Sequence, residues 1–475
     1  MTTPQNSYPL EPSADEMRRL VDAAMDRIVA HVQSLPNQPA HDLDGAEELA
    51  RELAEPMPER GADFEELLDL LFERAVPKSF NTAAPSYLAY IPGGGLFHSA
   101  VAGFIADAVN RYTGVWLAAP ALAQLESNVL RWFCDIVGYP ADARGILASG
   151  GSLANFSAVV TARREKLPDD FLKGTIYASD QVHHSVEKAA LLAGFPPKSV
   201  RTIPSDERFR IRLDALERSI GEDCREGSIP FMVVVSAGTT NTGAVDDLEG
   251  AADLARRHGL WLHADAAYGG FFMLTERGRA VMRGLELADS VTLDPHKGLF
   301  VAYGSGALLV RDGAALLRAH ALEAEYLPEM RDGAEFVDFC QLSPELSRPF
   351  RGLKVWLPFK LVGVQAFRDS LNEKLDLTIW ATERLREIEG IRIVAEPQLS
   401  VVAFRLVKDG LDDEATNELN RELLERINRR KRVYLTATTV RGEFLLRICV
   451  LSVRTHMDRM EMCIEDIRES VAELL

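Results

Sequence analysis

Between Met17 and Val32 apolar residues recur at three- and four-residue spacing, a pattern that predicts an amphipathic helix. A stretch rich in proline, glycine and acidic residues follows over 36–61, and a second helix is expected from Phe64 to Arg74. Two helices are too few to enclose a core of their own. We therefore expect segment 1–82 to pack on another surface, such as that of a partner subunit.

From about Pro85 the pattern changes to short apolar runs separated by helical segments. The runs lie at Gly145–Ala148, Thr175–Ala178, Phe231–Val235, Leu260–His263, Val291–Leu293 and Ala307–Val310. Because these runs are continuously apolar rather than alternating, both faces of each strand should be buried. This is typical of a mostly parallel sheet covered by helices. We predict a large α/β domain over 83–348.

After Pro349 the pattern changes again. A long helix is predicted near 352–388, and shorter elements follow it. The predicted strands lie at 401–405 and 444–448, and the predicted helices at 413–429 and 457–474. This mixture indicates a smaller α+β domain over 349–475.

The composition is that of a folded globular protein, with 47% hydrophobic and 26% charged residues in a chain of 475. The net charge of -18 opposes binding to nucleic acid or to an anionic membrane. Five scattered cysteines without a Cys-x-x-Cys pair indicate neither a disulfide framework nor a zinc site. Because the chain shows no export signal and no apolar stretch of about 20 residues, we expect a cytoplasmic protein with no nucleic-acid or membrane partner.

Polar side chains follow the predicted strands at their carboxyl ends, where open α/β sheets bind ligands. Ser149-Gly-Gly-Ser152 comes directly after the first predicted strand. Glycines let the backbone approach a ligand closely, and the N–H groups at a helix start attract phosphate. Gly151 and Ser152 are therefore candidate phosphate ligands. A tight turn in which Ser152 caps the next helix is the alternative.

Asp265 ends one predicted strand, and Lys297 follows the next, about one strand–helix–strand unit later. Adjacent strand ends can bring both side chains into one crevice. An amine there can form a Schiff base with the aldehyde of pyridoxal phosphate (PLP), while a carboxylate keeps the pyridine nitrogen protonated. Burial should lower the pKa of Lys297 and free its amine. A helix cap at Asp265 and a surface charge at Lys297 are the alternatives.

Two further strand ends carry side chains that suit a coenzyme. His183 follows the second strand and could stack on the coenzyme ring, and Thr240 offers a hydroxyl beside the ring. A plain turn is the alternative for each. His183, His184, His263 and Asp265 could also form a metal site, but they contain no ligand pair at i, i+4 spacing. We expect no metal.

Three segments together resemble the group II PLP-dependent amino-acid decarboxylases, the family of aromatic L-amino-acid, glutamate and histidine decarboxylases. Segment 180–188 matches the segment that carries the ring-stacking histidine, here His183. Segment 263–268 matches the one that contacts the pyridine nitrogen, and 295–297 the one with the coenzyme lysine. The resemblance implies the aspartate-aminotransferase type of fold (fold type I), bound PLP, and a homodimer with its active site at the subunit interface.

The resemblance also assigns roles outside these segments. It implies a mobile catalytic loop at 323–346 with Tyr326 as the catalytic tyrosine, and it places Ser152 and His296 at the phosphate. The chain departs from the family pattern at three positions. Asp294 stands near the phosphate where asparagine is usual, His184 replaces a small residue, and Leu153 replaces an acidic one.

We therefore predict a PLP-dependent decarboxylase that converts an L-amino acid to its amine and carbon dioxide. An aromatic substrate is expected if Tyr87, Tyr90, Ile91 and Phe97 line a pocket, although they could equally be core residues. The alternatives are another PLP reaction (aldehyde synthase, carbon–carbon lyase or aminotransferase) and a silent PLP-binding dimer. The tyrosine at position 326 argues against an aldehyde synthase, in which the proton donor is typically lost.

Overall fold

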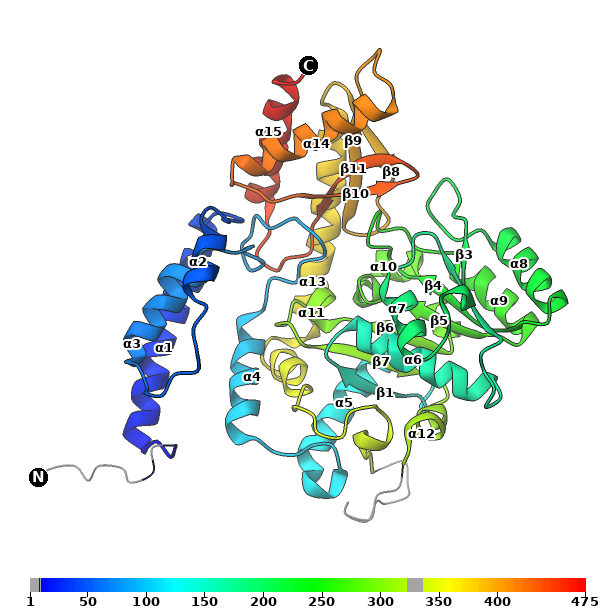
Figure 1. Ribbon diagram of the computed structural model, residues 1–475, viewed down its shortest axis with the longest axis horizontal. Coiled ribbons are helices and arrows are strands. Elements are labelled where there is room, and N and C mark those ends of the chain that lie inside the picture. Colours follow the sequence, from blue (N-terminus) through cyan, green and yellow to red (C-terminus); the bar gives the residue numbers. More distant parts are fainter. Residues whose placement is uncertain (1–7, 9, 323–335) are drawn as a thin grey trace, which may run out of the picture.

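A seven-stranded sheet organises the middle of the chain in the computed structural model, which describes residue 8 and residues 10–322 and 336–475 (Figure 1). Its strands are β1 (Arg144–Ala148), β2 (Gly174–Ser179), β3 (Val200–Ile203), β4 (Ile229–Ser236), β5 (Trp261–Asp265), β6 (Ser290–Leu293) and β7 (Gly306–Val310). They lie in the order β1-β7-β6-β5-β4-β2-β3, and only β7 runs antiparallel to its neighbours. The predicted mostly parallel sheet is confirmed.

The register of the central strands brings their carboxyl ends to one edge of the sheet. Ser236 at the end of β4 pairs with Asp265 at the end of β5, and Asp265 pairs with Thr292 near the end of β6. Each of these strands is followed by a loop or helix that carries polar residues. The edge is therefore the position at which a ligand of this sheet is expected to bind.

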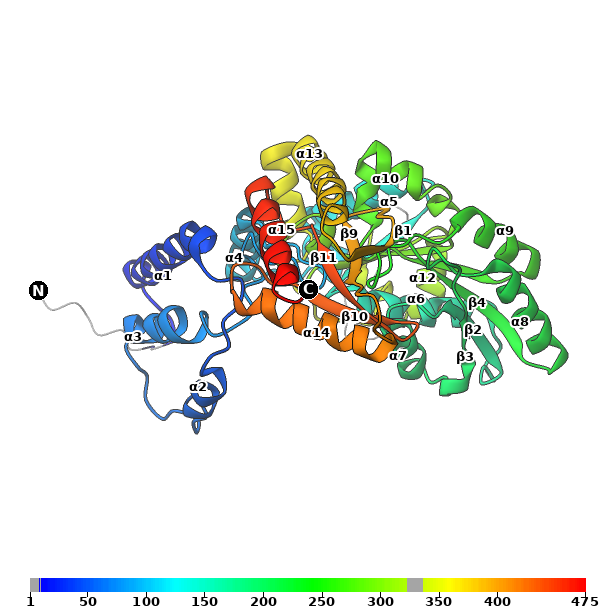
Figure 2. The same cartoon turned by 90° about the horizontal axis from the view of Figure 1, so that it is seen from above.

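Helices cover both faces of the sheet (Figure 1, Figure 2). The helices between residues 83 and 322 are α4 (Phe97–Val109), α5 (Pro120–Val137), α6 (Gly151–Lys166), α7 (Ser185–Leu192), α8 (Leu213–Arg225), α9 (Leu248–His258), α10 (Glu276–Val281), α11 (Pro295–Gly298) and α12 (Ala314–His320). The helix α6 packs closely on the sheet because Ala154, Ala158 and Ala162, at i, i+4 spacing, are fully buried and small.

A second sheet lies in the C-terminal lobe. Its strands β8 (Ile391–Ala395), β9 (Val401–Leu406), β10 (Thr436–Val440) and β11 (Glu443–Cys449) are antiparallel in the order β10-β11-β9-β8. Helices α13 (Leu353–Arg386) and α14 (Asp413–Arg429) pack against it, and α15 (Met457–Ala472) packs against these two helices. The long helix predicted near 352–388 is α13, which is interrupted at Gly363, where φ is 75°. The smaller α+β lobe has the predicted class.

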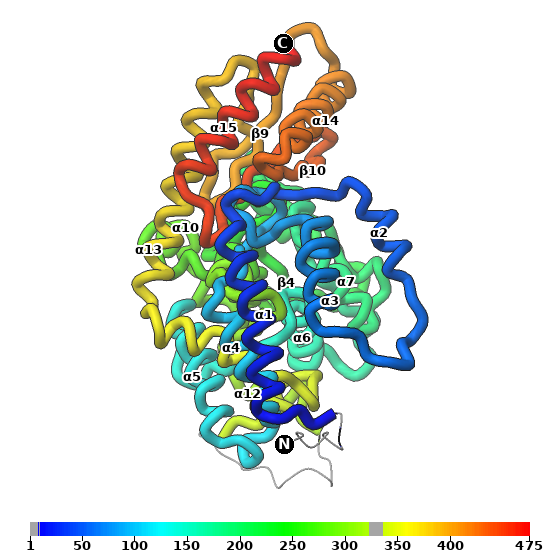
Figure 3. Tube along the Cα trace, turned by 90° about the vertical axis from the view of Figure 1, so that its left-hand side faces the viewer, coloured from blue at the N-terminus to red at the C-terminus, as the bar shows by residue number. Residues whose placement is uncertain are grey.

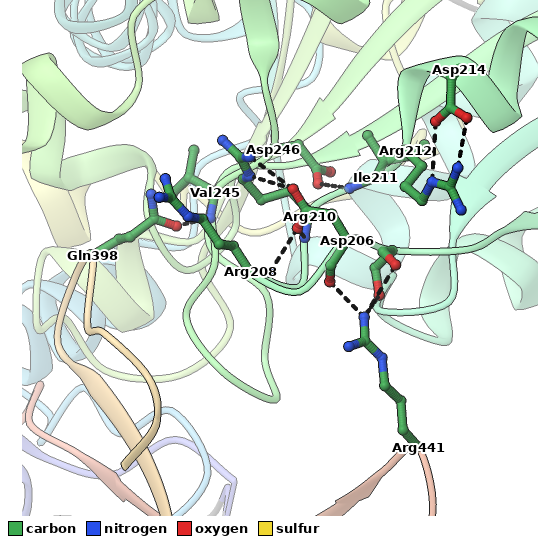
Figure 4. Close-up of polar contacts among 11 residues, drawn as sticks. Asp206, Arg208, Arg210, Ile211, Arg212, Asp214, Val245, Asp246, Gln398 and Arg441 are labelled. Atoms are coloured by element: carbon green, nitrogen blue, oxygen red, sulfur yellow. Dashed lines mark hydrogen bonds and ion pairs between the residues drawn. The ribbon is translucent and has the colours of Figure 1, made fainter.

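Polar contacts tie this lobe to the large sheet near the ligand-binding edge (Figure 4). Arg441, in the turn between β10 and β11, donates to the carbonyl oxygens of Ser205 at 3.1 Å and Asp206 at 2.5 Å. On the other side, the N–H of Val245 donates to Gln398 Oε1 at 2.8 Å. The loops that follow β3 and β4 are thus each tied to the C-terminal lobe.

The N-terminal helices form an arm that stands off the body (Figure 1, Figure 2). They are α1 (Ala14–Ser34), α2 (Ala46–Glu52) and α3 (Phe64–Asp69), and α3 continues as a π-helix over Leu70–Ala75. Figure 3 shows α1 and α3 side by side, and α1 has no buried residue. Within the described ranges, no helix has the length and apolar character needed to cross a bilayer.

Candidate active site

A cavity of about 330 Å³ opens at the carboxyl edge of the large sheet. Among its lining residues are eight of the nine that the sequence singled out for coenzyme and catalysis, namely Gly151, Ser152, His183, Thr240, Asp265, Asp294, His296 and Lys297. The ninth, Tyr326, lies outside the described residues. The cavity gathers side chains that are scattered over much of the chain because the strand ends meet at one edge.

Asp265 is the last residue of β5, and its side chain is held on both oxygens. Oδ1 accepts a hydrogen bond from the backbone N–H of Ala267 at 3.2 Å, and Oδ2 accepts one from Asn155 Nδ2 at 3.0 Å. The residue is only 8% exposed. A buried carboxylate with two donors and no cationic partner among the described side chains is suited to a positively charged ring nitrogen of a ligand.

Lys297, on α11 after β6, forms an ion pair with Asp294. Its Nζ lies 2.9 Å from Asp294 Oδ2, and the Asp294 side chain is 2% exposed. Burial acts to lower the pKa of Lys297, but the charge and hydrogen bond of Asp294 outweigh it, so the pKa is raised above its usual value. The prediction of a lowered pKa was wrong for the coenzyme-free chain because it left Asp294 out of account.

One end of the cavity is formed by the start of α6. The first N–H groups of a helix have no partner within it and carry partial positive charge, and α6 begins at Gly151. A Cβ added at Gly151 would lie 3.1 Å from Asp294 Oδ2 and 3.3 Å from Ala267 Cβ. The absence of a side chain at Gly151 thus lets Asp294 and Ala267 lie close to the start of α6, with Ser152 beside it.

His296 borders the same end. Its Nδ1 lies 2.6 Å from the carbonyl oxygen of Ser305, to which it donates. Its ring carbon Cε1 would be 3.4 Å from a Cβ added at Gly150, so the ring faces the start of α6. Its other ring nitrogen, Nε2, lies 3.7 Å from Asp294 Oδ2.

His183 lies on the side of the cavity next to α7. Its Nδ1 lies 2.7 Å from Ser185 Oγ, and burial lowers the pKa of its ring, which favours the neutral imidazole. Its neighbour His184 is exposed and does not line the cavity. Thr240 borders the cavity on another side, and its carbonyl oxygen accepts a hydrogen bond from Arg447 of β11.

Sequence reasoning missed several lining residues, among them Asn155, Ser185 and Tyr268. Asn155 lies one helical turn after Ser152 on α6, a spacing that places both on one face. Tyr268 connects the cavity to the C-terminal lobe, because its hydroxyl lies 2.9 Å from Ser400 Oγ and accepts from the Ser400 N–H at 2.8 Å. The helical spacing could have identified Asn155, whereas the contact of Tyr268 could not be read from the sequence.

The four residues considered for an aromatic pocket lie elsewhere. None of Tyr87, Tyr90, Ile91 and Phe97 is among the lining residues of this cavity. Tyr87 is buried against Tyr434 of the C-terminal lobe, with ring centroids 5.7 Å apart. Tyr90 is 50% exposed.

The polar groups of the cavity fit one kind of coenzyme. A carboxylate suits a protonated ring nitrogen, a helix start suits a phosphate, and a lysine amine can join to an aldehyde; all three line the same cavity. PLP has these three features. A sequence model of a known family, described as the pyridoxal-dependent decarboxylase conserved domain, matches residues 47–407.

The chain belongs to the pyridoxal-dependent decarboxylase family. It is 36% identical to an aromatic-L-amino-acid decarboxylase from Bacillus atrophaeus, over 98% of this chain and 97% of that protein. Two relatives at 28% identity have different names. An L-2,4-diaminobutyrate decarboxylase from Acinetobacter baumannii matches over 93% of this chain and 90% of its own, and a phenylacetaldehyde synthase from Petunia hybrida over 97% and 95%.

Solved structures agree with this assignment. The Oryza sativa TDC with PLP and tryptamine matches with a TM-score of 0.93 at 27% identity, over 98% of this chain and 99% of that one. The Catharanthus roseus tryptophan decarboxylase in complex with L-tryptophan matches with a TM-score of 0.91 at 27% identity, over 98% and 100%. The chain therefore has the fold of the PLP-dependent decarboxylases, fold type I, and is a PLP-dependent amino-acid decarboxylase.

Proposed function

We propose that the protein decarboxylates an aromatic L-amino acid to the corresponding amine and carbon dioxide. The observation that carries this proposal is that Asp265, Lys297 and the start of α6 share one cavity at the sheet edge. The aromatic class is supported by the name of the Bacillus atrophaeus relative and by the tryptamine and L-tryptophan in the two solved structures.

Each group around the cavity then has a role. Bound PLP supplies a ring that accepts the electron pair left when the carboxylate departs. Lys297 would hold the coenzyme through its aldehyde carbon and would give way to the substrate amine. Asp265 keeps the pyridine nitrogen protonated. With PLP bound, the imidazole of His183 would lie against the coenzyme ring and orient the substrate.

The phosphate end has its own set of residues. The N–H groups at Gly151 and Ser152 and the Ser152 hydroxyl bind the phosphate, with His296 beside them. Thr240 contributes a hydroxyl next to the ring. Asp294 borders the phosphate and pairs with Lys297 when the lysine amine is free.

Tyr326 is proposed to return a proton to the substrate Cα, with the loop 323–346 closing over the reaction. This role comes from the resemblance to the family, because the residue lies outside the described part of the chain. A tyrosine at this position favours release of an amine over formation of an aldehyde.

We infer that the working unit is a homodimer with its active site at the subunit interface. The arm supports this, since α1 buries no residue in the single chain and exposes Met17 (50%) and Val29 (40%). The helix α4 likewise exposes Phe104 (55%) and Val109 (45%). Apolar surface of this kind commonly marks an interface. Light scattering of the purified protein should give twice the mass of the 52.5 kDa chain.

A cytoplasmic location is part of the same proposal. All five cysteines are free in the structure, which suits a reducing compartment.

We also propose three parts of the chain: the arm over 1–82, the coenzyme-binding domain over 83–348 and the small domain over 349–475.

A substrate panel tests the proposed function. The PLP-loaded enzyme is incubated with single L-amino acids, including L-2,4-diaminobutyrate, and the amine and carbon dioxide are quantified by mass spectrometry. We expect equal amounts of both from an aromatic substrate, without ammonia or hydrogen peroxide. Ammonia with peroxide would indicate an aldehyde synthase instead, and turnover of only the non-aromatic substrates would contradict the aromatic class.

A further inference from the structure

Asn155 lines the cavity and lies at the centre of a buried hydrogen-bond network. It projects from the second turn of α6 and is 1% exposed. A side-chain amide has two N–H donors and an oxygen with two lone pairs, and here all four are used. Nδ2 donates to Ser185 Oγ at 2.9 Å and to Asp265 Oδ2 at 3.0 Å. Oδ1 accepts from Thr292 Oγ1 at 2.8 Å and lies 3.0 Å from His263 Nε2.

The orientation of this amide follows from its partners. The carboxylate of Asp265 can only accept hydrogen bonds, so the group that faces it must be the NH2 of Asn155. The amide oxygen then faces Thr292 and His263. A reversed amide would place oxygen against oxygen at Asp265, so only one orientation satisfies all the groups.

The protonation of His263 agrees with this orientation. Trp261 Nε1 donates to Ser290 Oγ at 2.8 Å, so the Ser290 hydroxyl is free to donate to His263 Nδ1, also 2.8 Å away. Burial lowers the pKa of His263, which favours a neutral ring with one proton. Because Nδ1 accepts, that proton is on Nε2 and is donated to Asn155. The hydrogen bonds of this branch therefore all have the same direction: Trp261 donates to Ser290, Ser290 to His263 and His263 to Asn155.

The other branch of the network reaches His183. The backbone N–H of Ser185 donates to His183 Nδ1 at 3.3 Å, and the Ser185 hydroxyl lies 2.7 Å from the same atom. Because Ser185 Oγ already accepts from Asn155, its own proton is free to point to Nδ1. Nδ1 is then an acceptor, and the neutral ring carries its proton on Nε2.

We propose that Asn155 is a positioning residue that fixes two groups of the active site at once. It directs the Asp265 carboxylate toward the pyridine nitrogen of PLP, and through Ser185 it determines which nitrogen of His183 carries the proton. The inference rests on the proposed function, since it connects both branches to the coenzyme. A network with a purely structural role would change stability but not the protonation of the bound coenzyme.

The substitution Asn155→Asp tests the donor half of the amide. It keeps the shape of the side chain and the oxygen that faces His263 and Thr292, but it places a second carboxylate beside Asp265. Two carboxylates in contact share a proton, which weakens the charge that Asp265 offers to PLP. Asn155→Ala removes both halves and serves as the second variant.

The main readout is the NMR shift of the pyridine nitrogen in enzyme loaded with isotopically labelled PLP. The wild type should show a protonated nitrogen at neutral pH, and both Asn155 variants should shift toward the unprotonated position. We expect kcat to fall about ten- to a hundredfold, the scale of losing a hydrogen bond to a charged group. KM should stay within about threefold, because the inference assigns Asn155 no contact with the substrate.

Two further variants separate the branches and control for stability. Ser185→Ala cuts only the branch to His183, so the nitrogen signal should be unchanged while kcat falls about tenfold. Thr161→Val, later on α6, removes a buried hydroxyl that donates to the Ser157 carbonyl oxygen at 2.7 Å. This control should leave both the nitrogen signal and kcat as in the wild type.

A protonated nitrogen in both Asn155 variants would overturn the inference, as would an equal loss of signal in Thr161→Val. If neither Asn155 variant folds, an unchanged kcat in Ser185→Ala overturns it. If the pyridine nitrogen loses its proton in the Asn155 variants, the positioning of Asp265 is supported even if the protein releases no carbon dioxide. The absence of carbon dioxide release would contradict the proposed function alone.

Discussion

The carboxylate of Asp294 lies 2.9 Å from Nζ of Lys297, three positions later in the chain. Its second oxygen, Oδ1, is buried without a hydrogen-bond partner among the described residues. The carboxylate also lies next to Gly151, where the phosphate of PLP is proposed to bind. The cavity thus contains a negative charge that balances Lys297 when its amine is free and opposes the phosphate once PLP is bound.

Asp294→Asn should strengthen PLP binding, because the amide removes a negative charge near the phosphate. We expect the Kd for PLP, measured by spectroscopic titration of the coenzyme-free protein, to fall roughly tenfold. The control is Asp253→Asn on α9, where the side chain is 64% exposed and far from the lining of the cavity. An unchanged or higher Kd in Asp294→Asn would show that this charge does not oppose the phosphate.

Asp265→Asn should bind PLP but decarboxylate slowly. A neutral amide cannot stabilise the positive charge on the pyridine nitrogen, so the ring becomes a weaker electron acceptor. Carbon dioxide release should be at least about a hundredfold slower, with PLP content equal to that of the wild type. A kcat within about threefold of the wild type would remove Asp265 from the proposed mechanism.

Gly306→Ala should disturb the phosphate end through the backbone. A Cβ at Gly306 would lie 2.5 Å from the Cα of Gly150, so β7 or the start of α6 must shift. We expect PLP binding to weaken roughly tenfold and the melting temperature to fall by several degrees. The matched control is Gly221→Ala on α8, where a Cβ meets no atom within 4 Å. Equal changes in PLP binding and in melting temperature in the two variants would show that the close approach of Gly306 to Gly150 does not shape the phosphate end of the cavity.

Asp246 should make stability depend on pH (Figure 4). Its carboxylate accepts from the N–H groups of Ser236 at 2.7 Å and Ile211 at 2.6 Å, and burial raises its pKa to about 6 from 3.8. Because the folded state holds this proton more tightly than the unfolded chain, the stabilisation is fully present below about pH 4 and is lost as the pH rises through about 6.

The comparison with Asp246→Asn isolates this effect. Relative to the variant, the wild type should gain up to about 3 kcal/mol as the pH falls from 7 to 4. Urea unfolding midpoints of the two proteins, measured across this range, give the difference. A constant difference between their midpoints would show that Asp246 does not titrate in the folded protein.

Much of the fold could be predicted because the strands of the large sheet are continuously apolar. The six predicted strands correspond to β1, β2, β4, β5, β6 and β7. The parallel order then brings Asp265 and Lys297 to one edge, as their spacing suggested. The sequence also identified the start of α6, because Gly151 and Ser152 directly follow a strand.

What could not be predicted depends on contacts between distant segments. The strands β3, β8 and β10 were missed because they carry partly exposed or polar positions, so their apolar signal is weak. The break in α13 at Gly363 was not anticipated either. Within the site, the raised pKa of Lys297 depends on the rotamer that brings Asp294 within hydrogen-bond distance. The hydrogen bond from Asn155 to Asp265 joins residues far apart in the sequence.

Borohydride reduction of the PLP-loaded enzyme, followed by peptide mass spectrometry, tests the central claim most directly. Reduction makes the link between the coenzyme and its lysine permanent. We predict one PLP adduct per chain, on the peptide that contains Lys297, and none in Lys297→Ala. An adduct on another lysine, or no adduct in a protein that retains PLP, would contradict the account.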